Sequence, residues 1–233
     1  MDPKKYQFDL PQSGRPDPFK IPEEYYPGVL DYMKKRSRRR PSSAIDAINT
    51  FVIHATAGGS SSGAMDVMRT GEVLIGGKIK KVKSSWHWLV PDENEKQHGK
   101  FVWSCVWESR AAFHVRDSVS HADVNGGKKR INDHSLGIEI VNTQNNDKFS
   151  DWQVEITAAI VRYAWSVYPN LKQIVSHAKL DPGRRTDPGK DFPWSKFKNL
   201  VLSGPPIPKI EKPQLLSALP AATPPTNDCC SIT

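Results

Sequence analysis

The chain has 233 residues and a formal net charge of +8, and 37% of its residues are hydrophobic. This length suits one domain with extensions or two small domains, and no run approaches the ~20 apolar residues of a membrane-spanning helix. Three cysteines are too few for a disulfide framework, so a hydrophobic core must hold the fold together. The positive charge favours anionic partners such as nucleic acid, acidic lipid or bacterial wall polymers.

Residues 1–45 are rich in proline and charge and show little periodicity, which predicts an extended arm or a loosely packed wrap. Their basic run, residues 34–40, is either a solvated segment ahead of the domain or an electrostatic contact with an anionic surface. The N-terminus has no apolar segment of the kind that secretory signals carry. We therefore expect synthesis in the cytoplasm, with the periplasm or cell wall as further sites of action after delivery or lysis.

Residues 46–203 carry the pattern of a globular domain. Short apolar runs bounded by polar residues predict five β-strands, at residues 51–54, 86–90, 101–106, 136–141 and 173–176. A capping box of Ser150 and Gln153 opens a helix that Pro169 ends, and shorter helices are predicted over residues 62–68 and 195–202. The mixture predicts a single α/β domain with a mixed β-sheet flanked by helices.

The remaining segment, residues 204–233, is rich in Pro, Ala, Ser and Thr and is predicted to be a tail without a core of its own. Cys229 and Cys230 lie in this tail. Cys105, in contrast, lies in an apolar run and is predicted to be a buried thiol.

Seven histidines are scattered along the chain with no local metal-binding pair, so any metal site must be assembled from distant segments. His54 ends an apolar strand and precedes a loop of small residues, which suits either a ligand facing a cleft or a surface histidine. His177 repeats this arrangement. It precedes a loop with two rigid Asp-Pro-Gly turns, in which Asp187 is either a ligand or a turn residue.

Glu139 lies within a strand that otherwise consists of apolar residues and glycine. Alternation places residues 136, 138 and 140 on one face of this strand and residues 137, 139 and 141 on the other. Apolar neighbours on both faces indicate a central strand, so Glu139 is a candidate site carboxylate as well as a candidate solvated side chain.

Taken together, these segments resemble the zinc-dependent N-acetylmuramoyl-L-alanine amidases of the AmpD-like type, whose fold is shared with peptidoglycan recognition proteins and phage amidase lysozymes. The resemblance extends from about Phe51 to Trp194. It rests on six strings in order: VIHAT, SSWHWLV, AAFHV, NDHSLGIEIVN, FSDWQ, and VSHAKLDPGRRTDPG followed by DFPW.

The resemblance implies one zinc ion and a role for each matching position. The zinc ligands are His54, His177 and Asp187. The carboxylate that handles the proton of the attacking water is Glu139, and Arg185 stands where many relatives have a catalytic lysine. The substrate groove contains His114, and His87 lies on the strand beside it. Two departures are Arg185, which can stabilise charge but not donate a proton, and Val115, where relatives often have a smaller residue.

The implied activity is hydrolysis of the amide between the lactyl group of N-acetylmuramic acid and L-alanine of the peptidoglycan stem peptide. The implied partner is peptidoglycan or a muropeptide, and we expect a monomer without membrane insertion. A non-catalytic muropeptide-binding module is the main alternative, although such modules typically lack a metal ligand. Nucleic-acid binding rests on charge alone, because the sequence contains no known nucleic-acid signature.

Overall fold

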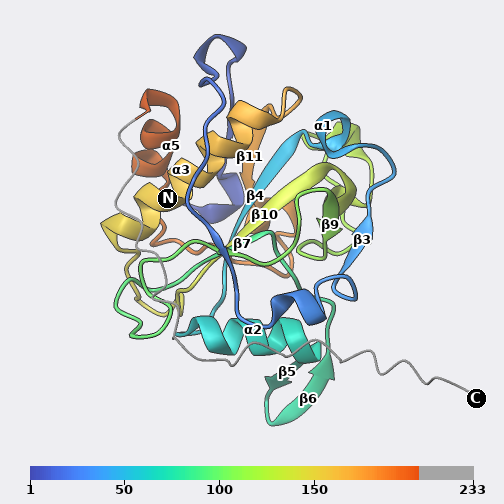
Figure 1. Cartoon of the computed structure of the whole chain (residues 1–233), viewed down its shortest axis with the longest axis vertical. Coiled ribbons are helices and arrows are strands. Elements are labelled where there is room, and N and C mark those ends of the chain that lie inside the picture. The colour runs from blue at the N-terminus through green and yellow to red at the C-terminus, as the bar shows by residue number, and fades with distance from the viewer. Residues whose placement is uncertain (205–233) are drawn as a thin grey trace, which may run out of the picture.

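A computed structural model describes residues 1–204. Its centre is a seven-stranded mixed sheet in the order β1-β11-β4-β10-β7-β8-β2 (Figure 1). The central strands β11, β4, β10 and β7 run parallel. Strand β1 pairs antiparallel with β11, and β8 pairs antiparallel with β7 but parallel with β2. The strands of this sheet are β1 (Gln7–Asp9), β2 (Glu24–Tyr25), β4 (Thr50–Ala55), β7 (Trp88–Val90), β8 (Trp103–Ser104), β10 (Ser135–Ile140) and β11 (Gln173–Ser176).

Two further pairs of strands stand apart from this sheet: β3 (Ser37–Arg39) with β9 (Arg110–Ala112), and β5 (Glu72–Ile75) with β6 (Lys78–Lys81). The helices are α1 (Ala44–Ala47), α2 (Ser61–Thr70), α3 (Asp151–Val167), α4 (His177–Leu180) and α5 (Trp194–Ser203). The predicted α/β class with a mixed sheet and flanking helices is confirmed. All five predicted strands and all three predicted helices are present, although the strand predicted over residues 101–106 is reduced to the two residues of β8.

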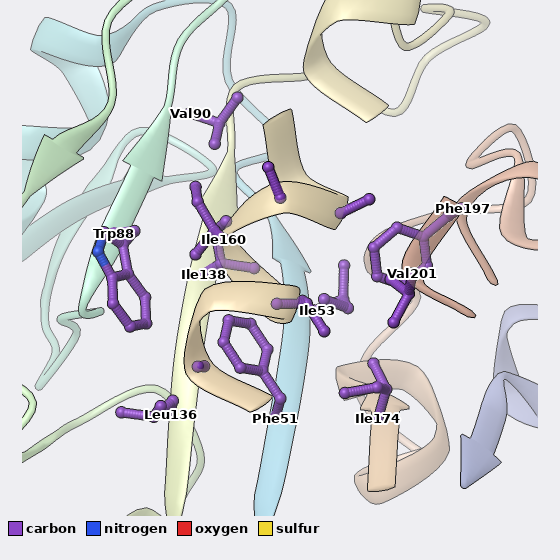
Figure 2. Close-up of a cluster of buried hydrophobic side chains, with 14 of the residues drawn as sticks. Phe51, Ile53, Trp88, Val90, Leu136, Ile138, Ile160, Ile174, Phe197 and Val201 are labelled. Atoms are coloured by element: carbon purple, nitrogen blue, oxygen red, sulfur yellow. The ribbon is translucent and has the colours of Figure 1, made fainter. Parts of the chain in front are cut away.

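The main hydrophobic core lies between the sheet and α3 (Figure 2). Strands β4 and β10 direct Phe51, Ile53 and Ile138 toward this helix, as the predicted alternation requires. The capping box at Ser150 and Gln153 starts α3 as predicted. The opposite face of the same strands is therefore left to carry polar side chains.

The N-terminal segment belongs to the same packed body. β1 pairs with β11, and Tyr6 is fully buried in the main core. In the basic run, Arg38 forms ion pairs with Asp117 and Asp133, and Arg40 is buried. Residues 1–45 thus supply both edge strands of the sheet, β1 and β2, and internal charge pairs, which the expectation of an extended arm or a loosely packed wrap did not include.

Cys105 is a buried free thiol, as predicted. The predicted tail with Cys229 and Cys230 lies outside the described residues, apart from Gly204, which ends α5 in a left-handed conformation. Within residues 1–204, no helix has the length and apolar character that crossing a bilayer requires.

Candidate metal centre and active site

Three predicted ligands converge at the carboxyl ends of two neighbouring parallel strands. His54 lies near the end of β4, and His177 follows β11 directly. The Nδ1 atoms of the two rings lie 2.9 Å apart, and Asp187 Oδ2 lies 3.2 Å from the first and 3.0 Å from the second. All three side chains are buried, and they form the one cluster of potential metal ligands found within residues 1–204.

Backbone hydrogen bonds hold the loop that carries Asp187 against α4. The amide of Ala178 donates to the carbonyl of Asp187 at 2.9 Å, and the amide of Gly189 donates to the carbonyl of Thr186 at 2.8 Å. Arg185 donates its amide to the carbonyl of Asp181 at 2.9 Å. The loop is thus ordered by its own turns, and it presents one carboxylate oxygen to both imidazoles.

Glu139 lies beside this cluster. In the parallel pairing of β10 with β4 it is directly opposite His54, so both side chains leave the sheet on the same face. Burial raises the pKa of the Glu139 carboxyl well above its usual range, and the negative charge of Asp187 raises it further. The exposed guanidinium of Arg185 opposes this shift, which places its positive charge within electrostatic reach of Glu139.

A directed chain of hydrogen bonds lies behind His54. Ser135 Oγ donates to the carbonyl of Ile131 at 2.9 Å, because a carbonyl can only accept. The same hydroxyl must then accept from His114 Nε2, at 3.1 Å. Burial keeps the pKa of His114 well below its ordinary value, so the ring is neutral and its Nδ1 is an acceptor. That atom lies 3.1 Å from His54 Nε2, which therefore carries the proton.

This polarity leaves a lone pair on His54 Nδ1, the atom that faces the cluster. Burial, followed by the nearby His177, lowers the pKa of His54 to about 4, so its ring stays neutral at pH 7. Burial opposes ionisation of Asp187, but the two neighbouring imidazoles, His177 first, outweigh it and lower the pKa of the carboxyl. Two acceptors, His54 Nδ1 and Asp187 Oδ2, thus face each other at 3.2 Å.

Facing acceptors repel one another unless a cation lies between them. Two imidazole nitrogens and one carboxylate oxygen are a common ligand set for catalytic zinc. Their separations of 2.9–3.2 Å are close to the ~3.3 Å expected between ligands of a tetrahedral ion with bonds of ~2.0–2.1 Å. The residues present therefore fit a bound metal ion.

The two remaining predicted histidines are buried rather than exposed to a groove. The ring of His114 covers Gly137, where a Cβ atom would lie 2.6 Å from the ring. His87 is fully buried and bonds backbone groups through both nitrogens: it accepts from the amide of Gly137 at 3.0 Å and donates to the carbonyl of Arg110 at 3.1 Å. The substrate contacts that the resemblance implies for these two histidines stay predictions.

Three residues that contact or position these buried histidines were not singled out from the sequence. Ser135 carries no local signal, because a serine at the start of a strand is common. Gly137 does carry one, since an isolated glycine inside a strand indicates a close approach of another group. Arg40 stood in a charged run, yet it donates to the carbonyls of Asn132, Asp133 and Ser135 at 2.8–3.0 Å.

Comparisons with known proteins identify the family of this chain. Residues 44–190 match the family of N-acetylmuramoyl-L-alanine amidases. The chain is 38% identical over 76 residues to the 1,6-anhydro-N-acetylmuramyl-L-alanine amidase AmpD of Escherichia coli, covering 32% of this chain and 41% of AmpD. It is 28% identical over 171 residues to the N-acetylmuramoyl-L-alanine amidase AmiD of the same organism, covering 69% of this chain and 56% of AmiD. The chain thus spans about half the length of these curated relatives.

Solved structures share the fold. A selenomethionine derivative of AmpD superposes with a TM-score of 0.55 at 23% identity, covering 80% of this chain and 98% of that one. AmpDh3 of Pseudomonas aeruginosa, in complex with an anhydromuramic pentapeptide, superposes with a TM-score of 0.54 at 21% identity, covering 68% and 61%. The family match extends over more than half of the sequence and contains both histidines, the aspartate and Glu139, and we conclude that this chain belongs to the N-acetylmuramoyl-L-alanine amidase family.

Proposed function

We propose that this chain is a zinc-dependent amidase that cleaves the bond between the lactyl group of N-acetylmuramic acid and L-alanine of peptidoglycan stem peptides. The observation that carries this proposal is the convergence of His54, His177 and Asp187 beside Glu139. The names of the relatives support it, since AmpD and AmiD of Escherichia coli are both named as amidases of muramyl-L-alanine bonds.

The two imidazoles and the carboxylate would hold the ion. Zinc bound there would supply Lewis-acid polarisation of the scissile carbonyl and would lower the pKa of a coordinated water toward ~7. The hydrogen-bond chain through His114 leaves the lone pair of His54 Nδ1 on the side of the ring that faces His177 and Asp187, where it would be available to an ion. In this proposal His114 and His87 support the site from behind, through the hydrogen bonds that they make to His54, Ser135 and the amide of Gly137.

Glu139 suits the proton-transfer role. Its carboxylate lies on the same face as His54, and burial raises its pKa, which makes it a stronger base than an exposed carboxylate. A carboxylate oxygen of Glu139 takes a proton from the attacking water and later gives it to the leaving amine of L-alanine. Arg185 stays protonated throughout, so it stabilises developing negative charge and transfers no proton.

The test is release of stem peptides from purified peptidoglycan by the full chain, measured before chelation, after chelation and after zinc is restored. We expect activity to disappear on chelation and to return with zinc. Activity that survives complete zinc removal would overturn the proposal. One zinc ion per chain without any cleavage would instead indicate a muropeptide-binding module. Intact sacculi and soluble anhydro-muropeptides serve as parallel substrates, because a preference for sacculi indicates action on the wall and a preference for fragments indicates recycling.

A further inference from the structure

The β5–β6 hairpin projects from the body beyond α2 (Figure 1) and carries exposed aliphatic side chains. Leu74, Ile75 and Ile79 are 69%, 51% and 70% exposed. Exposed aliphatic side chains gathered on one short hairpin indicate an interaction site more than chance, since scattered single residues are the norm on protein surfaces. The proposed amidase chemistry uses none of these residues.

The same hairpin is strongly cationic. Residues 72–83 contain four lysines and one glutamate. Lys78, Lys80 and Lys81 are exposed and have no ion-pair partner within 4.0 Å among residues 1–204, whereas Lys83 lies over the ring of Phe113. Positive charge is thus interleaved with aliphatic surface.

The strand register places both kinds of side chain on each face of the hairpin. Leu74 is opposite Ile79 on one face, and Ile75 is opposite Lys78 on the other. The turn between the strands consists of Gly76 and Gly77, both with positive φ, and has no side chain to hold the tip away from a flat surface. The end of the hairpin is therefore narrow, with aliphatic side chains next to the turn and lysine side chains beside them.

The base of the hairpin meets the basic run of the N-terminal segment. Arg36 packs over Gly71 and donates to the carbonyl of Arg69 at 2.9 Å, and Lys35 beside it is exposed. Positive charge therefore continues from the hairpin onto the body of the molecule. Arg36 and Lys35 both belong to the basic run of residues 34–40, for which the sequence indicates either a solvated segment or a contact with an anionic surface.

We propose that the β5–β6 hairpin docks the protein on an anionic phospholipid bilayer, with its aliphatic side chains in the interface and its lysines at the lipid phosphates. A second copy of the chain fits less well, because pairing two hairpins would bring like charges together. Nucleic acid and wall polysaccharide offer no apolar phase for Leu74, Ile75 and Ile79. The proposal is independent of the amidase activity.

Vesicle flotation of the full chain tests this docking. The vesicles are phosphatidylcholine alone, or phosphatidylcholine and phosphatidylglycerol in equal parts. We expect binding to the anionic vesicles only. The triple variant Lys78→Gln/Lys80→Gln/Lys81→Gln should weaken it on the order of 100-fold, at about fivefold per lysine. The double variant Leu74→Ser/Ile79→Ser should weaken it about tenfold or more, because it removes the apolar contribution alone.

The matched control is Lys128→Gln/Lys129→Gln/Lys172→Gln, which removes the same charge from exposed positions near the start of β4, at the opposite end of the strand from α2. This control should bind vesicles like the unaltered protein. An equal loss in both triple variants, or equal flotation with neutral and anionic vesicles, would overturn the proposal. So would hairpin variants that change the sedimentation of the free protein but not its flotation, because the hairpin would then be a contact between copies. The hairpin side chains are exposed, so the variants should fold normally, which thermal unfolding checks.

Discussion

Replacing Ser135 with alanine removes the hydroxyl that sets the direction of the hydrogen bonds behind His54. Ser135 Oγ lies 2.9 Å from the carbonyl of Ile131 and 3.1 Å from His114 Nε2. Without it, His114 is free to carry its proton on Nδ1, which would face the proton on His54 Nε2 at 3.1 Å. The lone pair of His54 would then no longer be fixed toward the metal.

The expected magnitude follows from the two hydrogen bonds that the hydroxyl makes. Changes behind a histidine ligand typically cost 10–100-fold in metal affinity, or about 1.4–2.7 kcal/mol. The variant also leaves a buried N–H and a buried carbonyl without this partner, which should lower the free energy of unfolding of the zinc-free protein by about 1–3 kcal/mol. Two separate effects are therefore expected, one on metal binding and one on stability.

Competition with a chromophoric zinc chelator measures the first effect, and thermal unfolding in excess chelator measures the second. Ser166→Ala is the matched control, because the Ser166 hydroxyl is also buried and donates to a backbone carbonyl, that of Tyr163, at 2.7 Å. It should lose a similar stability and keep its zinc affinity within about twofold. Zinc affinity of Ser135→Ala equal to that of the unaltered protein would refute the tautomer argument, even if stability falls.

Three further predictions concern the same region. Glu139→Gln should keep zinc and lose turnover by ~100-fold or more in a stem-peptide release assay, and unchanged turnover would place the base elsewhere. Gly137→Ala should weaken zinc binding and destabilise the fold, because the added Cβ lies 2.6 Å from the ring of His114; normal zinc affinity in a chelator competition would contradict this. Burial, then the charge of Arg40, lowers the pKa of His87 to about 3, so the unfolded chain binds this proton first on acidification. The contribution of neutral His87 to the free energy of unfolding is therefore fully present above about pH 6.5 and falls by roughly 4 kcal/mol toward pH 3. Denaturant titrations of His87→Asn should show a shallower fall than those of the unaltered protein.

Much of the site could be predicted from the sequence because its signals are local. The alternation around Glu139 indicated the face on which it lies, and its pairing opposite His54 agrees with that face. The start of α3 depends on the reciprocal hydrogen bonds of Ser150 and Gln153, which are three positions apart, so the local sequence is enough to specify it. The positions of His54 and His177 at strand ends were local too, and parallel pairing of β4 with β11 brought those ends together.

Other features were decided by tertiary structure, because they depend on contacts between segments that no short pattern specifies. Strand β1 joins the sheet through pairing of Gln7 with Val175, and nothing in a proline-rich segment indicates that partner. The position of His114 depends on the missing side chain of Gly137 in β10 and on the bond of His114 to His54 in β4, which come together only when these strands pair. The sequence by itself determined which side chains could bind a metal. The packed sheet decided which of the remaining histidines stand behind that candidate metal site, because buried polar atoms must find their partners within the core.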